Sequence, residues 1–382
     1  MPASAARSRT RPRSTRISIS TLAAPWPATA RPDAPADDPY AELARDLDAI
    51  VDGVRADLGE RDRAYIQRVI RTQRHLEVAG RMLLLASRYR PAAVAGTAAL
   101  SLAKVLENME LGHNILHGQW DWMQDPEIHS STWEWDAAST AASWKHAHNF
   151  QHHTYTNVLE LDRDLGYSAM RVEPEQPWHP VYLLQPVYFF LMAATFEWGI
   201  AIYDMELDAV RRGEKPKEKA RAEVRGLLRK ARRQILKDYV AFPALAGRRG
   251  AKRALAGNVT ANLVRNAWVH TIVFCGHLPE GAETFSEEEF RTETRGGWYR
   301  RQLLGSCNLE GSRLFHLLTG NLSFQIEHHL FPDLPSSRYA EIAPRVRAVC
   351  EKHGLPYNSG RLGRQYGSVY KQTLRLAFPG GG

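Results

Sequence analysis

The pattern of apolar positions along the chain predicts a mainly helical protein. Between residues 40 and 74, Leu43, Leu47, Ile50 and Val54 recur at the spacing of an amphipathic helix. Four later stretches are more continuously apolar, and we expect each to form a helix. These stretches comprise residues 76–87, 92–106, 181–203 and 259–275.

Charged residues, histidine or proline interrupt the first, third and fourth apolar stretches. Arg81 lies in the first, Pro186 and Glu197 in the third, and Arg265 and His270 in the fourth. A membrane-spanning helix needs about 20 mostly apolar residues, and charged groups within it generally face the bundle interior. Two fold classes therefore stay open: an all-α membrane bundle with about four apolar helices, and a soluble bundle that buries the same four helices.

Composition restricts the possible sites more than the possible folds. The chain has 382 residues, 44% of them hydrophobic, which is enough for a sizeable core. A mean hydropathy of −0.41 describes the whole chain and conceals the apolar stretches. The three cysteines include no C-x-x-C pair, so a metal would need other ligands, and 15 histidines are present. We expect one large domain over residues 39–382.

Net positive charge is confined to two segments. Residues 1–32 contain six arginines and no acidic residue, and residues 211–253 contain 16 basic and four acidic residues. Because the charge forms no continuous footprint, we do not expect a nucleic-acid partner. Residues 1–38 are predicted to be a disordered basic tail, although their composition also suits a transit peptide.

The second basic segment belongs to a predicted helical insertion at residues 205–253. We expect a charged surface helix followed by a loop that contains Pro243 and Gly247. The helix is either a solvated surface or a contact for anionic lipid headgroups, for the phosphates of an acyl carrier, or for an acidic electron donor.

Histidines occur in groups at helical spacing. His113 and His117 are four residues apart and share one helix face, as do His148 and His152. His153 is offset from His152 by about 100° on such a helix. The remaining groups are Gln325, His328 and His329, and, more loosely, Asn266, His270 and His277.

These groups predict a multi-histidine metal centre. Imidazole suits Zn, Cu, Fe or Ni, and eight or more ligands imply two ions. A di-iron carboxylate bundle requires two Glu-x-x-His motifs and two further Glu. Only Glu110 to His113 provides such a motif. We instead expect four carboxylates either to accept hydrogen bonds from ligand imidazoles or to lie at the surface, namely Glu110, Asp121, Asp162 and Glu327.

Three motifs carry a family resemblance. HNILHGQWDW, KHAHNFQHHTYTN and GNLSFQIEHHLFPDLP resemble the histidine boxes of membrane fatty acid desaturases, and the match runs from about residue 75 to about residue 345. The QIEHH box is similar to that of front-end and actinobacterial acyl-CoA desaturases. The resemblance implies a helical membrane domain with a cytoplasmic helical cap, two iron ions, and O2-dependent insertion of a cis double bond into an acyl-CoA or lipid substrate. In a bacterium, the enzyme would lie in the inner membrane with its active site facing the cytoplasm.

The resemblance also implies the metal ligands. His277, in GHLPEG, resembles the histidine that the family places between boxes two and three. Asn266 and His270 resemble an Asn-x-x-x-His pair of animal acyl-CoA desaturases, and Gln325 is a further possible ligand. The choice between His270 and His277 therefore stays open. The implied ligand set is His113, His117, His148, His152, His153, His277, His328 and His329.

The chain departs from front-end members, which commonly carry a fused cytochrome domain with an HPGG signature. The only His-Pro here is His179-Pro180, followed by Val181. We therefore expect a separate electron donor: a ferredoxin, a cytochrome or an NAD(P)H-dependent flavin reductase. A hydroxylase or epoxidase of the same superfamily, and a non-enzymatic membrane metal-binding protein, remain alternatives.

The expected topology contains a conflict. Boxes two and three must meet, so an even number of crossings must separate them, and residues 181–203 and 259–275 provide two. That arrangement places the basic insertion opposite the irons, whereas short basic loops favour the cytoplasm. We expect one or both segments to re-enter or to lie in the interface. Five of the ten tryptophans lie between Trp120 and Trp144, either as an interfacial belt, which we favour, or as walls of an acyl tunnel.

Overall fold

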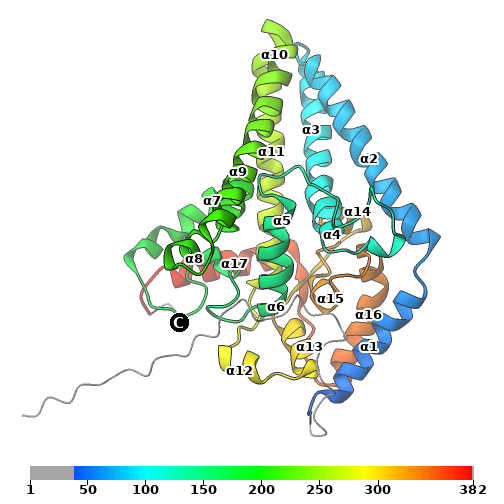
Figure 1. The fold of residues 1–382 in the computed structure, drawn as a ribbon, viewed down its shortest axis with the longest axis vertical. Coiled ribbons are helices and arrows are strands. Elements are labelled where there is room, and N and C mark those ends of the chain that lie inside the picture. Colours follow the sequence, from blue (N-terminus) through cyan, green and yellow to red (C-terminus); the bar gives the residue numbers. More distant parts are fainter. Residues whose placement is uncertain (1–37, 381–382) are drawn as a thin grey trace, which may run out of the picture.

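The computed structural model describes residues 38–380 and shows a mainly helical fold (Figure 1). The predicted basic tail lies outside these residues, except for Asp38. The one sheet among the described residues pairs two three-residue strands, β1 (Asn308–Glu310) in parallel with β2 (Ser359–Arg361), and the fold is otherwise helical, as the all-α prediction expects. The principal helices are α1 Ala41–Ala56, α2 Glu60–Leu85, α3 Arg90–Leu106, α7 Gln185–Tyr203, α8 Leu207–Arg212, α9 Lys217–Gln234, α10 Phe242–Leu245, α11 Gly247–His277, α12 Glu287–Thr292, α13 Arg295–Leu304, α14 Arg313–Leu318, α15 Gln325–Leu330, α16 Tyr339–Lys352 and α17 Leu362–Leu376.

Helices α2, α3 and α11 converge on an apex beside α10, and shorter helices gather at the opposite, broader end (Figure 1). Glycines allow the close approach of α2 and α3. A Cβ at Gly80 would lie 2.8 Å from the backbone N of Leu100, and one at Gly96 would lie 2.9 Å from Cβ of Leu83. These contacts bring the two backbones together and give the bundle a rigid frame.

All four predicted apolar stretches lie in helices, but only one has the character of a membrane span. Within the described chain, the segment Pro180–Arg212 alone has the length and apolar composition to cross a membrane. The first and fourth stretches form parts of the longer helices α2 and α11, which include Arg81 and Arg265. By this criterion the expected number of about four spans is reduced to one.

The apolar helix α7 is broken in its middle. Thr195 has non-helical dihedral angles (φ −110°, ψ 19°). Before the break, Phe189 packs on Phe274, and beyond it Phe196 and Tyr203 contact Tyr167. The third predicted stretch is therefore bent rather than a single straight helix.

The basic insertion is helical almost throughout. It consists of α8, α9, a π-helical segment Ile235–Ala241 and α10. The predicted loop around Pro243 and Gly247 was wrong. Pro243 lies directly after the π-helical segment, within a helical run that continues to Leu245, and Gly247 (φ +69°) makes a tight turn into α11.

Helices α2, α3 and α11, with the π-helical segment and α10, form the part of the molecule toward the apex (Figure 1), which we call the upper bundle. Charged side chains inside it pair with one another. Asp238, in the π-helical segment, is fully buried and lies 2.8 Å from Arg81 of α2 and 3.0 Å from Lys104 of α3. Arg265 of α11 pairs with Glu197 of α7. The ionisable residues that interrupt the apolar stretches thus join the helices from inside.

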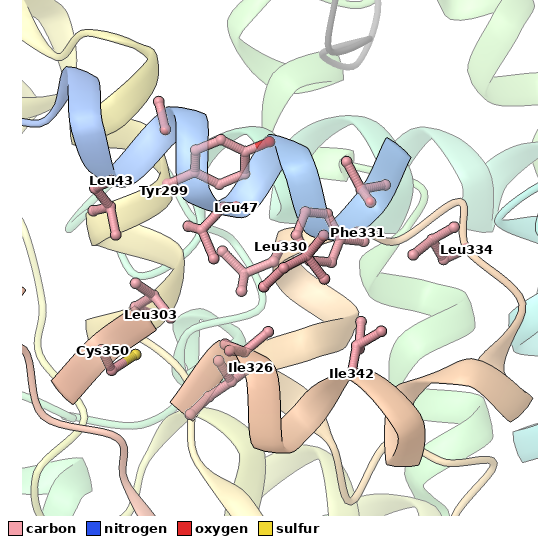
Figure 2. Packing of buried hydrophobic residues seen from close by; sticks show 14 of the residues in the cluster. Leu43, Leu47, Tyr299, Leu303, Ile326, Leu330, Phe331, Leu334, Ile342 and Cys350 are labelled. Carbon is pink, nitrogen blue, oxygen red and sulfur yellow. The ribbon is translucent and has the colours of Figure 1, made fainter. Parts of the chain in front are cut away.

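The N-terminal helix α1 covers the helix of the third histidine box. Its predicted apolar face is buried, with Leu43, Leu47, Ile50 and Val54 each at most 4% exposed. Figure 2 shows Leu43 and Leu47 among Leu303 of α13, Ile326 and Leu330 of α15, and Ile342 and Cys350 of α16. This core fixes α15, and with it the third box, against the broad end of the molecule.

Candidate metal centre

The histidine motifs lie at π-helical segments, in a short helix or at the end of a helix. His113 of the first box ends a π-helical segment, Glu107–His113, that follows α3, and His148 and His152 of the second box lie in another, Lys145–His152. The third box occupies α15, and His277 is the last residue of α11. Single π-helical turns are rare and frequent at functional sites, because they change which side chains share a face.

The structure brings all eight predicted histidines into one cluster. Within each group the candidate ligand atoms lie within 4.8 Å of one another. His153 joins the groups, since its ring lies 4.6 Å from that of His117 and 4.4 Å from that of His329. The groups are His113, His117, His148 and His328; His152, His277 and His329; and His153 with His328 and His329.

The donor set fits metal ions. Within the cluster, Nε2 of His117, His328 and His329 and both ring nitrogens of His153 are buried without a hydrogen-bond partner among the described residues; outside it, the same holds for both ring nitrogens of His270. Buried polar atoms nearly always have a partner, so the nitrogens of the cluster mark a place for a ligand. Burial, together with the neighbouring imidazoles, holds the pKa of His153 and of His328 well below the usual value. Neutral imidazoles with free lone pairs are what transition metals bind.

Polar groups behind the histidines fix the rings by their Nδ1 atoms. His152 Nδ1 lies 3.0 Å from Asp162, and His148 Nδ1 lies 3.2 Å from Asp164. This arrangement leaves Nε2 of each ring for a metal. Asp164 was missed, although the spacing Asp162-x-Asp164 was readable. The other Nδ1 contacts are His113 to Asn114 Oδ1, His277 to Gly305 O, His328 to Tyr339 Oη, and His329 to Gln302 Oε1.

Three of the four predicted carboxylates do not contact the cluster. Asp121 accepts hydrogen bonds from Ser130 in a loop, and Glu327 accepts them from Asn308 and Tyr357. Glu110 accepts hydrogen bonds from Tyr65, Asn114, Asn321 and Ser336. The expectation that these carboxylates orient ligand imidazoles directly was therefore wrong, because each is occupied by other donors. Glu110 reaches His113 only through Asn114.

The remaining ligand candidates differ in whether they reach the histidine cluster. His270 lies among aromatic rings, 4.0 Å from Phe274 and 4.7 Å from Phe189 between ring centroids. Asn266 donates a hydrogen bond to Ala194 O. Neither joins the cluster, so the geometry favours His277. Gln325 lies beside it, with Nε2 3.0 Å from His277 Nε2.

A pocket extends from the cluster into the helices. Trp144 stacks on His148 and also contacts His113 and His117, and it lines the pocket together with Trp135. Both tryptophans are buried, so the favoured interfacial belt was wrong for them. Apolar walls suit an alkyl chain. Other wall residues are Met109, Tyr167, Phe196, Ile200, Val269, Val273 and Leu322, and Glu197 and Asn266 also line the pocket.

Replacing Asp162 by Asn is expected to weaken metal binding by about 10- to 100-fold, because the amide no longer fixes His152 as a carboxylate does. Metal remaining per chain after equilibration with graded chelator measures this change. Asp121→Asn is the matched control and is expected to bind metal as the wild type does. Equal affinities for all three proteins would contradict the assigned role of Asp162.

Comparisons with known proteins identify the family of this chain. The model of the fatty acid desaturase family matches residues 90–361. The chain is 47% identical over 340 residues to the NADPH-dependent stearoyl-CoA 9-desaturase of Mycobacterium tuberculosis, covering 88% of this chain and 80% of that protein. Fatty acid desaturase 3 of Bos taurus is 29% identical over 57% of this chain and 46% of its own length. The sn-1 linoleoyl-lipid 6-desaturase of Synechocystis is 25% identical over 70% of this chain and 75% of its own length. The resemblance read from the three motifs is confirmed: this chain belongs to the fatty acid desaturase family and is an oxidoreductase of lipid metabolism.

Proposed function

We propose that this chain introduces a cis double bond at C9 of stearoyl-CoA and similar acyl-CoA substrates, using two iron ions and O2. The observation that carries the proposal is the eight-histidine cluster at one end of an apolar pocket. The position of the bond and the carrier rest on the name of the mycobacterial relative. In balance, one –CH2–CH2– unit, O2, two electrons and two protons give –CH=CH– and two water molecules.

The eight histidines of the cluster would hold the two ions between them. When bound, they supply the oxygen-dependent oxidation that no side chain can perform. The protein's own residues have other tasks. Asp162 and Asp164 hold His152 and His148 by their Nδ1 atoms. Trp135 and Trp144 keep water from the pocket and position the acyl chain beside the histidines.

The upper bundle would lie in the membrane. Several of its large apolar side chains are exposed, among them Val78, Val94, Val240 and Leu245. The α3 end at Arg90 and His113 are 23 residues apart, which is about 35 Å along a helix and slightly more than the ~30 Å hydrocarbon core. The histidine cluster would then lie at the cytoplasmic face and the apex at the opposite face.

This placement answers part of the topology conflict, because α9 comes to the side of the histidines while the cations of residues 248–253 stay on the opposite face. The two crossings between boxes two and three would be α11 and the continuous helical run of α9, the π-helical segment and α10 (Lys217–Leu245), and the bent helix α7 would lie in or re-enter the near interface. The basic helix α9 then begins on the side of the histidines. Its exposed cations suit an acidic, NADPH-linked electron donor. They are Lys217, Lys219, Arg221, Arg225, Arg229, Arg232 and Arg233.

Fatty acid profiling in a host that lacks its own C9 desaturase tests the proposal. Expression of the chain with a reductase partner is expected to give oleate from stearate, identified by mass spectrometry of double-bond adducts. The empty vector is the control. A hydroxylated or epoxidised product, or a double bond at another carbon, would contradict the proposal.

A further inference from the structure

Two turns at the apex bring six cations together without a counter-charge. The α2–α3 turn (residues 86–92) and the start of α11 (residues 246–254) contain no acidic residue. The turns touch, since Ser87 Oγ donates to Gly250 O at 2.9 Å. Within residues 38–380 none of the six cations forms an ion pair, and all are exposed. They are Arg88, Arg90, Arg248, Arg249, Lys252 and Arg253.

An apolar groove runs from this apex between α3 and α11. Arg253 lines its apical end, and small side chains leave it hollow. Thr97 Oγ1 donates to Ala93 O, so this hydroxyl is satisfied within its own helix. The groove is therefore suited to an alkyl chain rather than to a polar ligand. Other residues that line it are Ala98, Ala256 and Thr260.

The apex lies at the depth of the lipid headgroups when the histidines lie at the opposite membrane face. Arg253 is 24 residues before His277 in α11, about 36 Å along the helix, against a hydrocarbon core of about 30 Å. With the histidines at one membrane face, Arg253 lies at the headgroups of the other. Short loops rich in Lys and Arg are disfavoured on that side, so six cations there call for anionic partners.

We propose that the apex and groove bind an anionic glycerophospholipid, with its phosphate on Arg253 and neighbouring cations and one acyl chain in the groove. The proposal rests on the membrane placement given above and not on the reaction. A second copy of the chain fits the groove less well, because parallel packing would bring two sets of six like charges together.

Native mass spectrometry of the delipidated full chain in detergent tests this site. Wild-type protein is expected to bind phosphatidylglycerol at least about tenfold more tightly than phosphatidylcholine with the same acyl chains. A hydrogen bond to a charged group contributes at least as much free energy as a tenfold change in affinity requires. Arg249→Gln should reduce this preference without touching the fold, and Arg253→Gln should reduce it further. Ala256→Leu should weaken both lipids by filling the groove. Arg229→Gln, the same charge change on α9, is the control and should bind as the wild type does.

Three outcomes would overturn the proposal. The first is equal binding of the two lipids by the wild type. The second is unchanged binding in the Arg249, Arg253 and Ala256 variants while circular dichroism shows a folded protein. The third is a wild-type dimer that Ala256→Leu dissociates without changing lipid binding, which would assign the groove to a second copy. Because binding is measured without turnover, failure here leaves the desaturase proposal intact, and loss of unsaturated product leaves this site intact.

Discussion

Replacing His152 or His329 by Ala is expected to abolish formation of unsaturated fatty acid. Both belong to the group of three imidazoles completed by His277, with ring centroids 4.5–5.0 Å apart. Removing one of three ligands leaves too few to hold an ion in this group. Iron per chain should fall by about one ion, and desaturated product should fall below detection, as measured by elemental analysis and gas chromatography of the same preparation.

His270→Phe is the matched control, because His270 is equally buried but packs only on aromatic rings. This variant should keep its iron. Loss of iron in His270→Phe together with normal iron in His277→Ala would instead assign the ligand role to His270. Normal iron and product in both His152→Ala and His329→Ala would refute the di-iron assignment of this cluster.

The candidate ligand histidines were predictable from sequence, but the residues that contact their Nδ1 atoms were not. Pairs four residues apart, such as His113 and His117, share a face whatever the tertiary structure, so their spacing carries the prediction. Gln302 and Tyr339 reach His329 and His328 from separate helices. No local pattern distinguishes such residues from other polar positions of α13 and α16. Glu110 shows the converse error, because a carboxylate one turn from a histidine was read as its partner without knowledge of its other donors.

The positions of several helices were predictable from sequence, but the break in α7 and the burial of part of the insertion were not. Apolar periodicity located parts of α1, α2, α3, α7 and α11. It did not show the break at Thr195, where the half of α7 before the break packs on Phe274 and the half beyond it contacts Tyr167. The insertion was misjudged for a related reason. Its charged sequence indicates a solvated helix, whereas Asp238 is buried because α2 and α3 offer it two cations.

Removing that buried carboxylate should cost far more stability than removing an exposed one. Asp238→Ala would leave Arg81 and Lys104, each with a side chain at most 6% exposed, without their closest anion. Breaking a buried ion pair from one side costs about 3–5 kcal/mol, because the remaining charge stays desolvated. The free energy of unfolding in mixed detergent micelles is expected to fall by about that amount. The loss should be visible as a lower midpoint of thermal unfolding.

Asp208→Ala is the comparison that separates burial from charge. Asp208 also pairs with two cations, Arg163 at 3.2 Å and Arg212 at 2.9 Å, but its side chain is 51% exposed. Water replaces its ion pairs, so its removal should cost less than about 1 kcal/mol. If both variants lost equal stability, the buried pairs would not be holding α2 and α3 to the insertion. A large loss confined to Asp238→Ala would mean that the charges in the apolar helices act as internal joints of the bundle, which is why the chain can keep them in helices that are otherwise apolar.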